Sequence, residues 1–244
     1  MPCNSADASL LTFSLGTDEE GSDVFCDLAK MPHLLVAAKH AGEKREFLHS
    51  ILHEFSRSPS QDVRFLLIDS MQEDLARFGG VSHLMMPLVQ NDPEKAISFL
   101  NWMVVEMERR FQLFQESGVR DLPRYNEAKP EEKMHRIVIV LSELAELMIP
   151  RREETEIALC RLAQMGRAAG IHLILATKYP DEKVLSGLIR ANVPSRISFG
   201  VQTVTESRYI LDQKGAETLD QGELLYLPLA APRPRKIFFK SENQ

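Results

Sequence analysis

Apolar residues occur along the chain in two patterns, as short uninterrupted runs and as longer stretches in which they recur every three or four positions. Uninterrupted runs are typical of strands that are buried on both faces of a parallel sheet. Such runs predict strands at residues 33–38, 63–69, 135–144 and 171–177. Shorter runs predict further strands at 195–201, 222–228 and 235–240, and segments 10–16 and 22–28, which flank the turn-rich TDEEG, predict a β-hairpin.

The three-to-four spacing predicts helices between these strands. The helix after the first buried run carries an apolar stripe made of Phe47, Leu48, Ile51, Leu52 and Phe55. Further helices are predicted at 93–118, 152–170 and 182–192, the second ending at Gly170. Because strands alternate with helices, we predict an α/β domain with a mostly parallel central sheet and helices on both faces. We expect one domain over residues 11–240, a loose segment at 1–10 and a short tail at 241–244.

Composition excludes several classes of protein. The chain has 244 residues, 44% of them hydrophobic, which is enough to bury a sizeable core. Its formal net charge of −6 means that any contact with nucleic acid must come from a local basic patch. Cys3, Cys26 and Cys160 are widely spaced, so we expect no disulfide framework or zinc site and a reducing, cytoplasmic location. We also expect no signal peptide and no membrane segment, because no apolar run reaches about 18 residues.

The histidines offer little sign of a metal site. His49 and His53 lie four residues apart on one predicted helix, which is a spacing that metals accept. No HExxH motif and no third ligand lies nearby, so we predict no metal site.

The stretch HLLVAAKHAGEKREFLHSIL has the strand–turn–helix order in which phosphate-binding loops occur. The loop consensus G-x-x-x-x-G-K-[ST] supplies backbone N–H groups, a phosphate-binding lysine and a magnesium-binding hydroxyl. Here only Lys44 keeps its type, since Ala38, Glu43 and Arg45 replace the other fixed positions and Gly42 comes one residue early. Taken alone, this stretch favours an ordinary strand–turn–helix over a damaged nucleotide site.

Two other strand ends carry polar residues. RIVIVLSELAELM places Ser142 and Glu143 where an ATPase would have an Asp-Glu pair for magnesium and water. Lys178 follows the strand 171–177, at a position that often senses a γ-phosphate. A buried strand with a polar exit and a solvated lysine are the simpler interpretations of these two features.

Nine arginines lie between residues 151 and 235. They are Arg151, Arg152, Arg161, Arg167, Arg190, Arg196, Arg208, Arg233 and Arg235. A solvated helix face is the default interpretation, with a DNA-facing stripe as the alternative. Aromatic residues do not alternate with them, so stacking on single-stranded bases is not expected.

Several longer stretches together resemble one family. They are DLAKMPHLLVA, EMERRF with GVRDLPRYNE, RLAQMGRAAGIHLILAT, GLIRANVPSRISF, and ESRYILDQKGAETL followed by GELLYLP. In this order and spacing, over about residues 11–238, they resemble the RecA-like motor domain of FtsK/SpoIIIE DNA translocases. The resemblance implies a RecA-like P-loop NTPase fold, ATP as cofactor, a hexameric ring as a homo- or hetero-oligomer, and duplex DNA as a partner. It also implies a membrane anchor before the motor and a winged-helix module after it.

The resemblance assigns roles residue by residue. It makes Lys44 the phosphate lysine and Glu143 the catalytic, water-orienting carboxylate, with Arg196 and Arg208 as candidates for an arginine that acts on a neighbouring subunit. It places the remaining nucleotide-site positions at Lys39, Gly42, Arg45, Ser142 and Lys178. The sequence departs from the family at the loop, at Ser142, at Lys178 in place of a sensing Gln, and at Asp69-Ser70-Met71 in place of Asp-Pro-Lys.

These departures cluster on the nucleotide chemistry, and three functions fit them. The first is a ring-forming, DNA-associated or partner-binding subunit that hydrolyses ATP poorly or not at all, with ATP bound weakly if at all and Mg²⁺ not expected. The second is an active DNA translocase in which Lys39, Lys44 and Arg45 replace the metal. The third is an interaction subunit, as in protein-secretion machines, that does not bind DNA.

Overall fold

The computed structural model describes residues 9–31, 33–69 and 74–240, and over these residues nine strands form one sheet. Their order across the sheet is β2-β1-β9-β8-β7-β3-β6-β5-β4. The strands are β1 (Thr12–Asp18), β2 (Asp23–Asp27), β3 (Leu34–Ala37), β4 (Val63–Ile68), β5 (Arg136–Leu141), β6 (Ile171–Thr177), β7 (Ser195–Ser198), β8 (Glu223–Leu227) and β9 (Arg235–Phe238). The expected loose segment and tail fall almost entirely outside the described residues, as do Ser70 and Met71.

The sheet is mixed, so the prediction of a mostly parallel sheet needs correction. The strands from β7 to β4 pair in parallel, whereas β8, β9, β1 and β2 extend the sheet with antiparallel pairings. Short connections explain two of the antiparallel pairings, β1–β2 and β8–β9. Short turns join β1 to β2 and β8 to β9, and a short turn returns the chain beside the strand that it has just left, in the opposite direction. The other two differ, because β7 and β8 are joined by a connection that contains α7, and β1 and β9 come from opposite ends of the chain.

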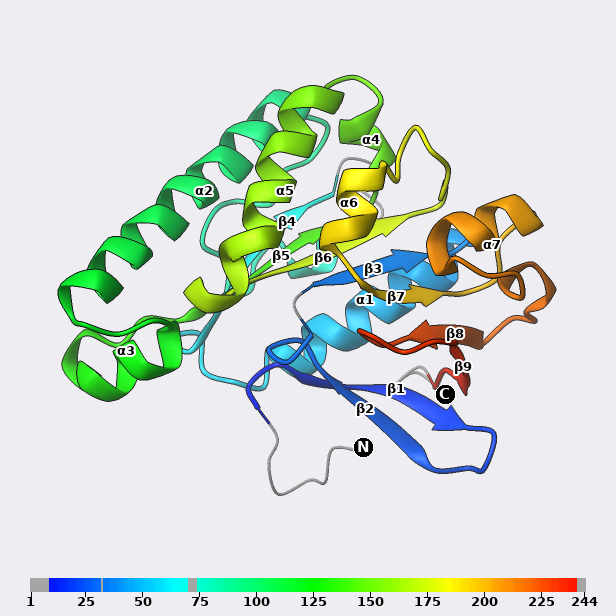
Figure 1. Cartoon of the computed structure of the whole chain (residues 1–244), viewed down its shortest axis with the longest axis horizontal. Helices are drawn as coiled ribbons and strands as arrows, with labels where there is room; N and C mark the ends of the chain where they lie inside the picture. Colours follow the sequence, from blue (N-terminus) through cyan, green and yellow to red (C-terminus); the bar gives the residue numbers. More distant parts are fainter. Residues whose placement is uncertain (1–8, 32, 70–73, 241–244) are drawn as a thin grey trace.

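Helices cover both faces of the sheet, as predicted (Figure 1). They are α1 (Ala41–Phe55), α2 (Pro93–Glu116), α3 (Leu122–Ala128), α4 (Ala145–Met148), α5 (Arg152–Ala169), α6 (Gly187–Asn192) and α7 (Val204–Leu211). The alternation along β3 shows how the faces divide. Leu34 and Val36 pack in one core with α1 and the β1–β2 hairpin, whereas Leu35 and Ala37 pack in the other core with α2 and α5. None of the helices in the described residues is long and apolar enough to cross a bilayer.

The predicted helix boundaries agree with the structure where a capping residue marks the end of the helix. Asp92 caps α2 by accepting a hydrogen bond from the backbone N–H of Lys95 at 2.9 Å, and Gly170 ends α5 with φ +74°. Of the helix predicted at 182–192, only the part from Gly187 onward is helical. The helices α3, α4 and α7 were not predicted. For α7 a signal was present, because Thr203 and Glu206 form a capping box.

Two residues of the family-like stretches hold helices against the sheet. Arg110 of EMERRF is fully buried, and it donates to Glu106 Oε1 (2.8 Å), His135 O (2.9 Å) and Ala169 O (2.8 Å). It thereby joins α2 to the end of α5 and the start of β5. Gly166 lets α5 approach β6 closely, because a Cβ atom there would lie 2.8 Å from Ile171 O. Arg110 and Gly166 therefore serve the packing of helices on the sheet.

Candidate nucleotide site

The turn between β3 and α1 is short, and two of its N–H groups are bonded to neighbouring strand ends. Only residues 38–40 separate the end of β3 from the first residue of α1. The N–H of Ala38 donates to Thr177 O at 3.2 Å, and the N–H of Lys39 donates to Gly200 O at 2.8 Å, so both are used by neighbouring strand ends. Gly42 and Glu43 belong to the first turn of α1. The N–H groups of Ala38 and Lys39 are thus not open to a phosphate.

Lys44 lies in the core, where its own chain surrounds its ammonium group. The side chain is 1% exposed. Nζ lies 2.6 Å from Ser142 O, 2.9 Å from Asp74 Oδ2 and 3.3 Å from Glu143 Oε2. An ammonium group has three protons to donate, and three oxygens of the protein stand around this one. A phosphate would have to displace one of them.

Ser142 turns its hydroxyl into the protein. Its Oγ donates to Asp69 Oδ1 at 2.8 Å, and the residue is fully buried. The second oxygen of Asp69 accepts from the backbone N–H groups of Asp74 (3.1 Å) and Leu75 (2.7 Å). This network ties the ends of β4 and β5 to the segment before Leu75, and it leaves the Ser142 hydroxyl committed to a carboxylate.

Glu143 is also occupied by its own chain. Its Oε1 accepts from the Thr177 hydroxyl at 2.6 Å, and its Oε2 accepts from the backbone N–H of Lys178 at 3.0 Å and contacts Lys44. The residue is 2% exposed. A carboxylate that orients a water molecule needs an oxygen that is open to that water, and the contacts of Glu143 hold both of its oxygens.

The cluster carries an excess of negative charge. Asp69, Asp74 and Glu143 bring three carboxylates to the single ammonium of Lys44, and all four side chains are at least 95% buried. Among the described residues, Asp74 Oδ1 is buried without a hydrogen-bond partner. Because like charges at low dielectric repel each other, this cluster disfavours the approach of a further anion.

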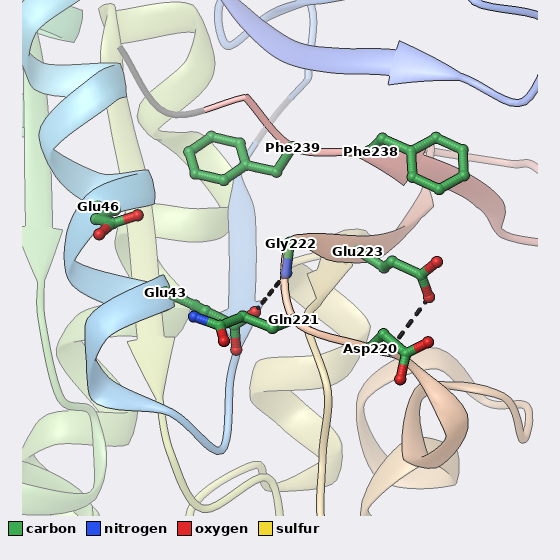
Figure 2. Close-up of a pocket in the computed structure, with 8 residues that line it drawn as sticks. All are labelled: Glu43, Glu46, Asp220, Gln221, Gly222, Glu223, Phe238 and Phe239. Atoms are coloured by element: carbon green, nitrogen blue, oxygen red, sulfur yellow. Dashed lines mark hydrogen bonds between the residues drawn. The ribbon is translucent and has the colours of Figure 1, made fainter. Parts of the chain in front are cut away.

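A cavity of about 530 Å³ lies beside the first turn of α1, and acidic and aromatic side chains line it (Figure 2). Glu43 points toward the β8 turn, where its Oε1 accepts from Gly222 N at 3.0 Å. The remaining lining residues are Glu46, Asp220, Gln221, Glu223, Phe238 and Phe239. Among the described residues that line the cavity, four carry carboxylates, and one of these, Glu223, pairs with Lys236 at 2.8 Å.

The other residues predicted at the nucleotide site differ in exposure, and the backbone N–H of Lys178 bonds to Glu143. Lys39 lies against Gly200, where a Cβ atom would meet Lys39 Nζ at 3.1 Å. Arg45 is exposed although Lys44 beside it is buried, and Lys178 is half-buried. Of Lys39, Lys44 and Arg45, only Lys44 is buried. No group of three or more His, Cys, Asp and Glu residues in the described part of the chain has an arrangement that could hold a metal ion.

The two candidates for a trans-acting arginine differ in exposure. Arg196 is 7% exposed, and it donates to Ile210 O (3.2 Å), Arg190 O (3.0 Å) and the carboxylate of Asp212. It joins the ends of α6 and α7 within one chain. Arg208 on α7 is exposed. A role on a neighbouring subunit stays a prediction, and the geometry favours Arg208 for it.

Several surface arginines are paired with carboxylates. Arg151 pairs with Glu94 at 2.6 Å, Arg161 with Glu108, and Arg190 with Asp212. Helix α5 therefore presents Arg161 beside an acidic residue of α2 rather than as part of a purely basic stripe.

Sequence reasoning missed Asp74 and Thr177, which are central to the cluster. Thr177 is the last residue of β6, and polar residues at the carboxyl ends of parallel strands form the usual ligand edge of such sheets. That position was a usable signal. Asp74 lies between β4 and a 3₁₀ turn at Ala76–Phe78, in a polar stretch whose pattern does not show that it folds back onto Lys44.

The comparisons with known proteins agree with the fold. The model of the FtsK/SpoIIIE family matches residues 3–182. The chain belongs to the FtsK/SpoIIIE family. It is 45% identical over 232 residues to the DNA translocase FtsK of Caldanaerobacter subterraneus, covering 94% of this chain and 32% of the relative. It is 42% identical over 247 residues to the DNA translocase FtsK of Halalkalibacterium halodurans, covering 97% of this chain and 31% of that relative.

The chain thus spans about a third of the length of these FtsK relatives. Among solved structures, the pCW3 conjugation coupling protein TcpA with ATPγS superposes with a TM-score of 0.83 at 25% identity, covering 99% of this chain and 69% of that one. The cytoplasmic domain of the type VII secretion ATPase EccC of Thermomonospora curvata gives 0.81 at 21% identity, covering 95% and 28%. The fold is that of the P-loop ATPase motor domains, as the family resemblance implied.

Proposed function

We propose that this FtsK-type motor domain is a catalytically silent subunit, which hydrolyses ATP poorly or not at all. The observation that carries the proposal is the Lys44 ammonium, which Ser142 O, Asp74 and Glu143 surround in the core. The residue that should hold the outer phosphates is bonded to the residue that should orient the attacking water.

The residues present do not fit a magnesium–nucleotide complex. The position that should supply a metal-binding hydroxyl is the exposed Arg45, and the Ser142 hydroxyl is committed to Asp69. A metal ion contributes several kcal/mol to phosphoryl transfer by neutralising the developing charge. Each 1.36 kcal/mol lost from barrier stabilisation costs a factor of about ten in rate, so we expect turnover to fall by two or more decades relative to an intact motor.

The relatives named DNA translocase FtsK support the rest of the proposal. We infer that the chain joins a homo- or hetero-oligomeric ring of FtsK-type motor domains on duplex DNA. There it would contribute contacts to the ring but no ATP hydrolysis. The exposed Arg208 would supply contacts to neighbours or to phosphates.

The direct test is steady-state ATP hydrolysis by the purified protein, with Mg²⁺ and with duplex DNA present and absent. We expect no DNA-stimulated turnover above background. Hydrolysis at an ordinary motor rate that Lys44→Ala abolishes would end the proposal. Nucleotide binding that survives EDTA would instead favour the second function, in which basic side chains replace the metal.

A second measurement separates DNA association from a purely protein-binding role. We expect binding to duplex DNA that weakens steeply as salt rises, because bound phosphates release counterions when they are neutralised. A flat response at low salt would favour the interaction subunit without DNA.

A further inference from the structure

The Asp74 carboxylate is a neighbour of Lys44 that neither family motif supplies. It comes from the segment between β4 and the turn at Ala76–Phe78, and its Oδ2 lies 2.9 Å from Nζ. This is closer than Glu143 Oε2, which lies 3.3 Å away and also serves Lys178. Among the described residues, Asp74 is therefore the nearest carboxylate to the lysine that the family uses for phosphate.

The backbone holds Asp74 in place from two sides. Its N–H donates to Asp69 Oδ2 at 3.1 Å, which fixes it to the end of β4. Its carbonyl oxygen contacts His49 Nε2 at 2.5 Å, which fixes it to α1 two turns beyond the start of that helix. The carboxylate is thus positioned before any ligand arrives, as a preorganised partner for the ammonium.

The hydrogen-bonding capacity of the Asp74 carboxylate is only partly used by the described residues. Asp74 is 4% exposed, and its Oδ1 is buried without a hydrogen-bond partner among the described residues. A buried unpartnered oxygen costs free energy, and the cluster already holds Asp69 and Glu143 as further negative charges. The cluster therefore has more negative charge than Lys44 needs for compensation.

We propose that Asp74 is a built-in counter-anion that occupies Lys44 in place of a phosphate and keeps this site closed to nucleotides. The inference rests on the proposed function, and it explains how nucleotide is kept away from Lys44. It concerns binding rather than turnover, because the replacements at Arg45 and Ser142 act on hydrolysis independently of Asp74.

The test compares Asp74→Asn with the wild-type chain, using inorganic triphosphate and ATP as probes in calorimetric titrations without and with Mg²⁺. We expect the variant to bind triphosphate at least tenfold more tightly, because the ammonium loses its charged partner. The gain should disappear when Lys44→Gln is added to Asp74→Asn. Glu46→Gln is the matched control, since it removes the same charge from an exposed position on α1, and we expect its affinity to equal that of the wild type.

Each other outcome contradicts the inference. Unchanged affinity in Asp74→Asn would show that Asp74 does not exclude the anion. An equal gain in Glu46→Gln would show that overall charge, rather than occupation of Lys44, sets affinity. A variant that fails to fold would make Asp74 a structural counter-charge. ATP turnover by the wild-type chain would overturn the proposed function instead, and that assay is separate from these titrations.

Discussion

Lys44 Nζ lies 3.3 Å from Glu143 Oε2, so the two residues that the family resemblance assigns to phosphate and to water contact each other. Through this contact α1 is joined to the end of β5, in a region where both side chains are 1% exposed. Buried ion pairs are costly to break on one side, because the remaining charge has no partner and no water. Loss of either residue of this pair is therefore expected to change stability as well as function.

Replacing Lys44 with Met should lower the free energy of unfolding by about 3–5 kcal/mol, the usual cost of leaving a buried charge uncompensated. Three carboxylates would lose their only nearby cation within the cluster. Urea denaturation monitored by circular dichroism measures the change. Arg45→Met is the control, since Arg45 is exposed and its loss should change stability by no more than about 0.5 kcal/mol. Equal effects of the two substitutions would contradict the buried cluster.

Replacing Gly42 with Ala should leave stability unchanged or raise it by up to about 1 kcal/mol, because alanine is the better helix former. Gly42 lies in the first turn of α1, and a Cβ atom there would meet nothing within 4 Å. Thermal unfolding measures the effect. Gly166→Ala is the comparison, because its Cβ atom would lie 2.8 Å from Ile171 O, and we expect it to cost about 1–3 kcal/mol. A large loss of stability in Gly42→Ala would mean that this position needs a glycine backbone.

Replacing Arg110 with Met should destabilise the fold by about 3–5 kcal/mol, because Glu106 and the carbonyl oxygens of His135 and Ala169 would lose a buried donor. Arg109→Met provides the matched control. Arg109 also bonds to Glu106, but its side chain is 53% exposed, so its loss should cost less than about 1 kcal/mol. The measurement is again the midpoint and slope of urea unfolding, and similar losses for both variants would refute the assigned role of Arg110.

Stability should fall as the solution becomes mildly acidic, because burial lowers the pKa of His33 from 6.5 to about 4. The hydrogen bond to Ala163 O opposes this shift, and the positive charge of Arg167 adds to it. The unfolded chain binds the proton more tightly than the folded chain. The free energy of unfolding is therefore unaffected by His33 above about pH 6.5, decreases as pH falls toward 4, and loses about 3 kcal/mol in all.

The matched variant is His33→Gln, whose amide can donate to Ala163 O and accept from Leu173 N as the neutral imidazole does. Unfolding measured at several pH values between 4 and 7 should show a shallower slope for this variant. Part of the slope should remain, since burial also lowers the pKa of His172 well below its usual value. An identical slope in both proteins would exclude His33 as a source of the pH dependence of stability.

Apolar periodicity was sufficient to predict most of the fold, because core strands and core helices are selected by burial. It located the buried strands β3 to β6 and the helices α1, α2 and α5 within a few residues. Strand direction was not in that pattern. The β1–β2 hairpin was predicted from its turn, but the antiparallel pairings of β7 with β8 and of β9 with β1 have no signal in periodicity. Helix α7 was marked by a capping box rather than by an apolar stripe.

The site was predictable in its position and not in its contacts. The family resemblance placed Lys44, Ser142 and Glu143 in one site, and the structure brings these three together. The contact of Lys44 with Asp74 joins residues far apart in the sequence, and nothing in the local pattern of Asp74 indicates it. Arg196 resembled other arginines in the sequence, and only its place in β7 shows that it is buried.

The short turn at residues 38–40 has one more consequence. A long glycine loop can change its shape as phosphate arrives and leaves, and it can pass that change to the rest of a machine. Here the first turn of α1 is already wound, and its lysine is anchored at three points. Under the proposed function, such a subunit would keep one conformation while active neighbouring subunits hydrolyse ATP. It would then act as a rigid support for their conformational changes.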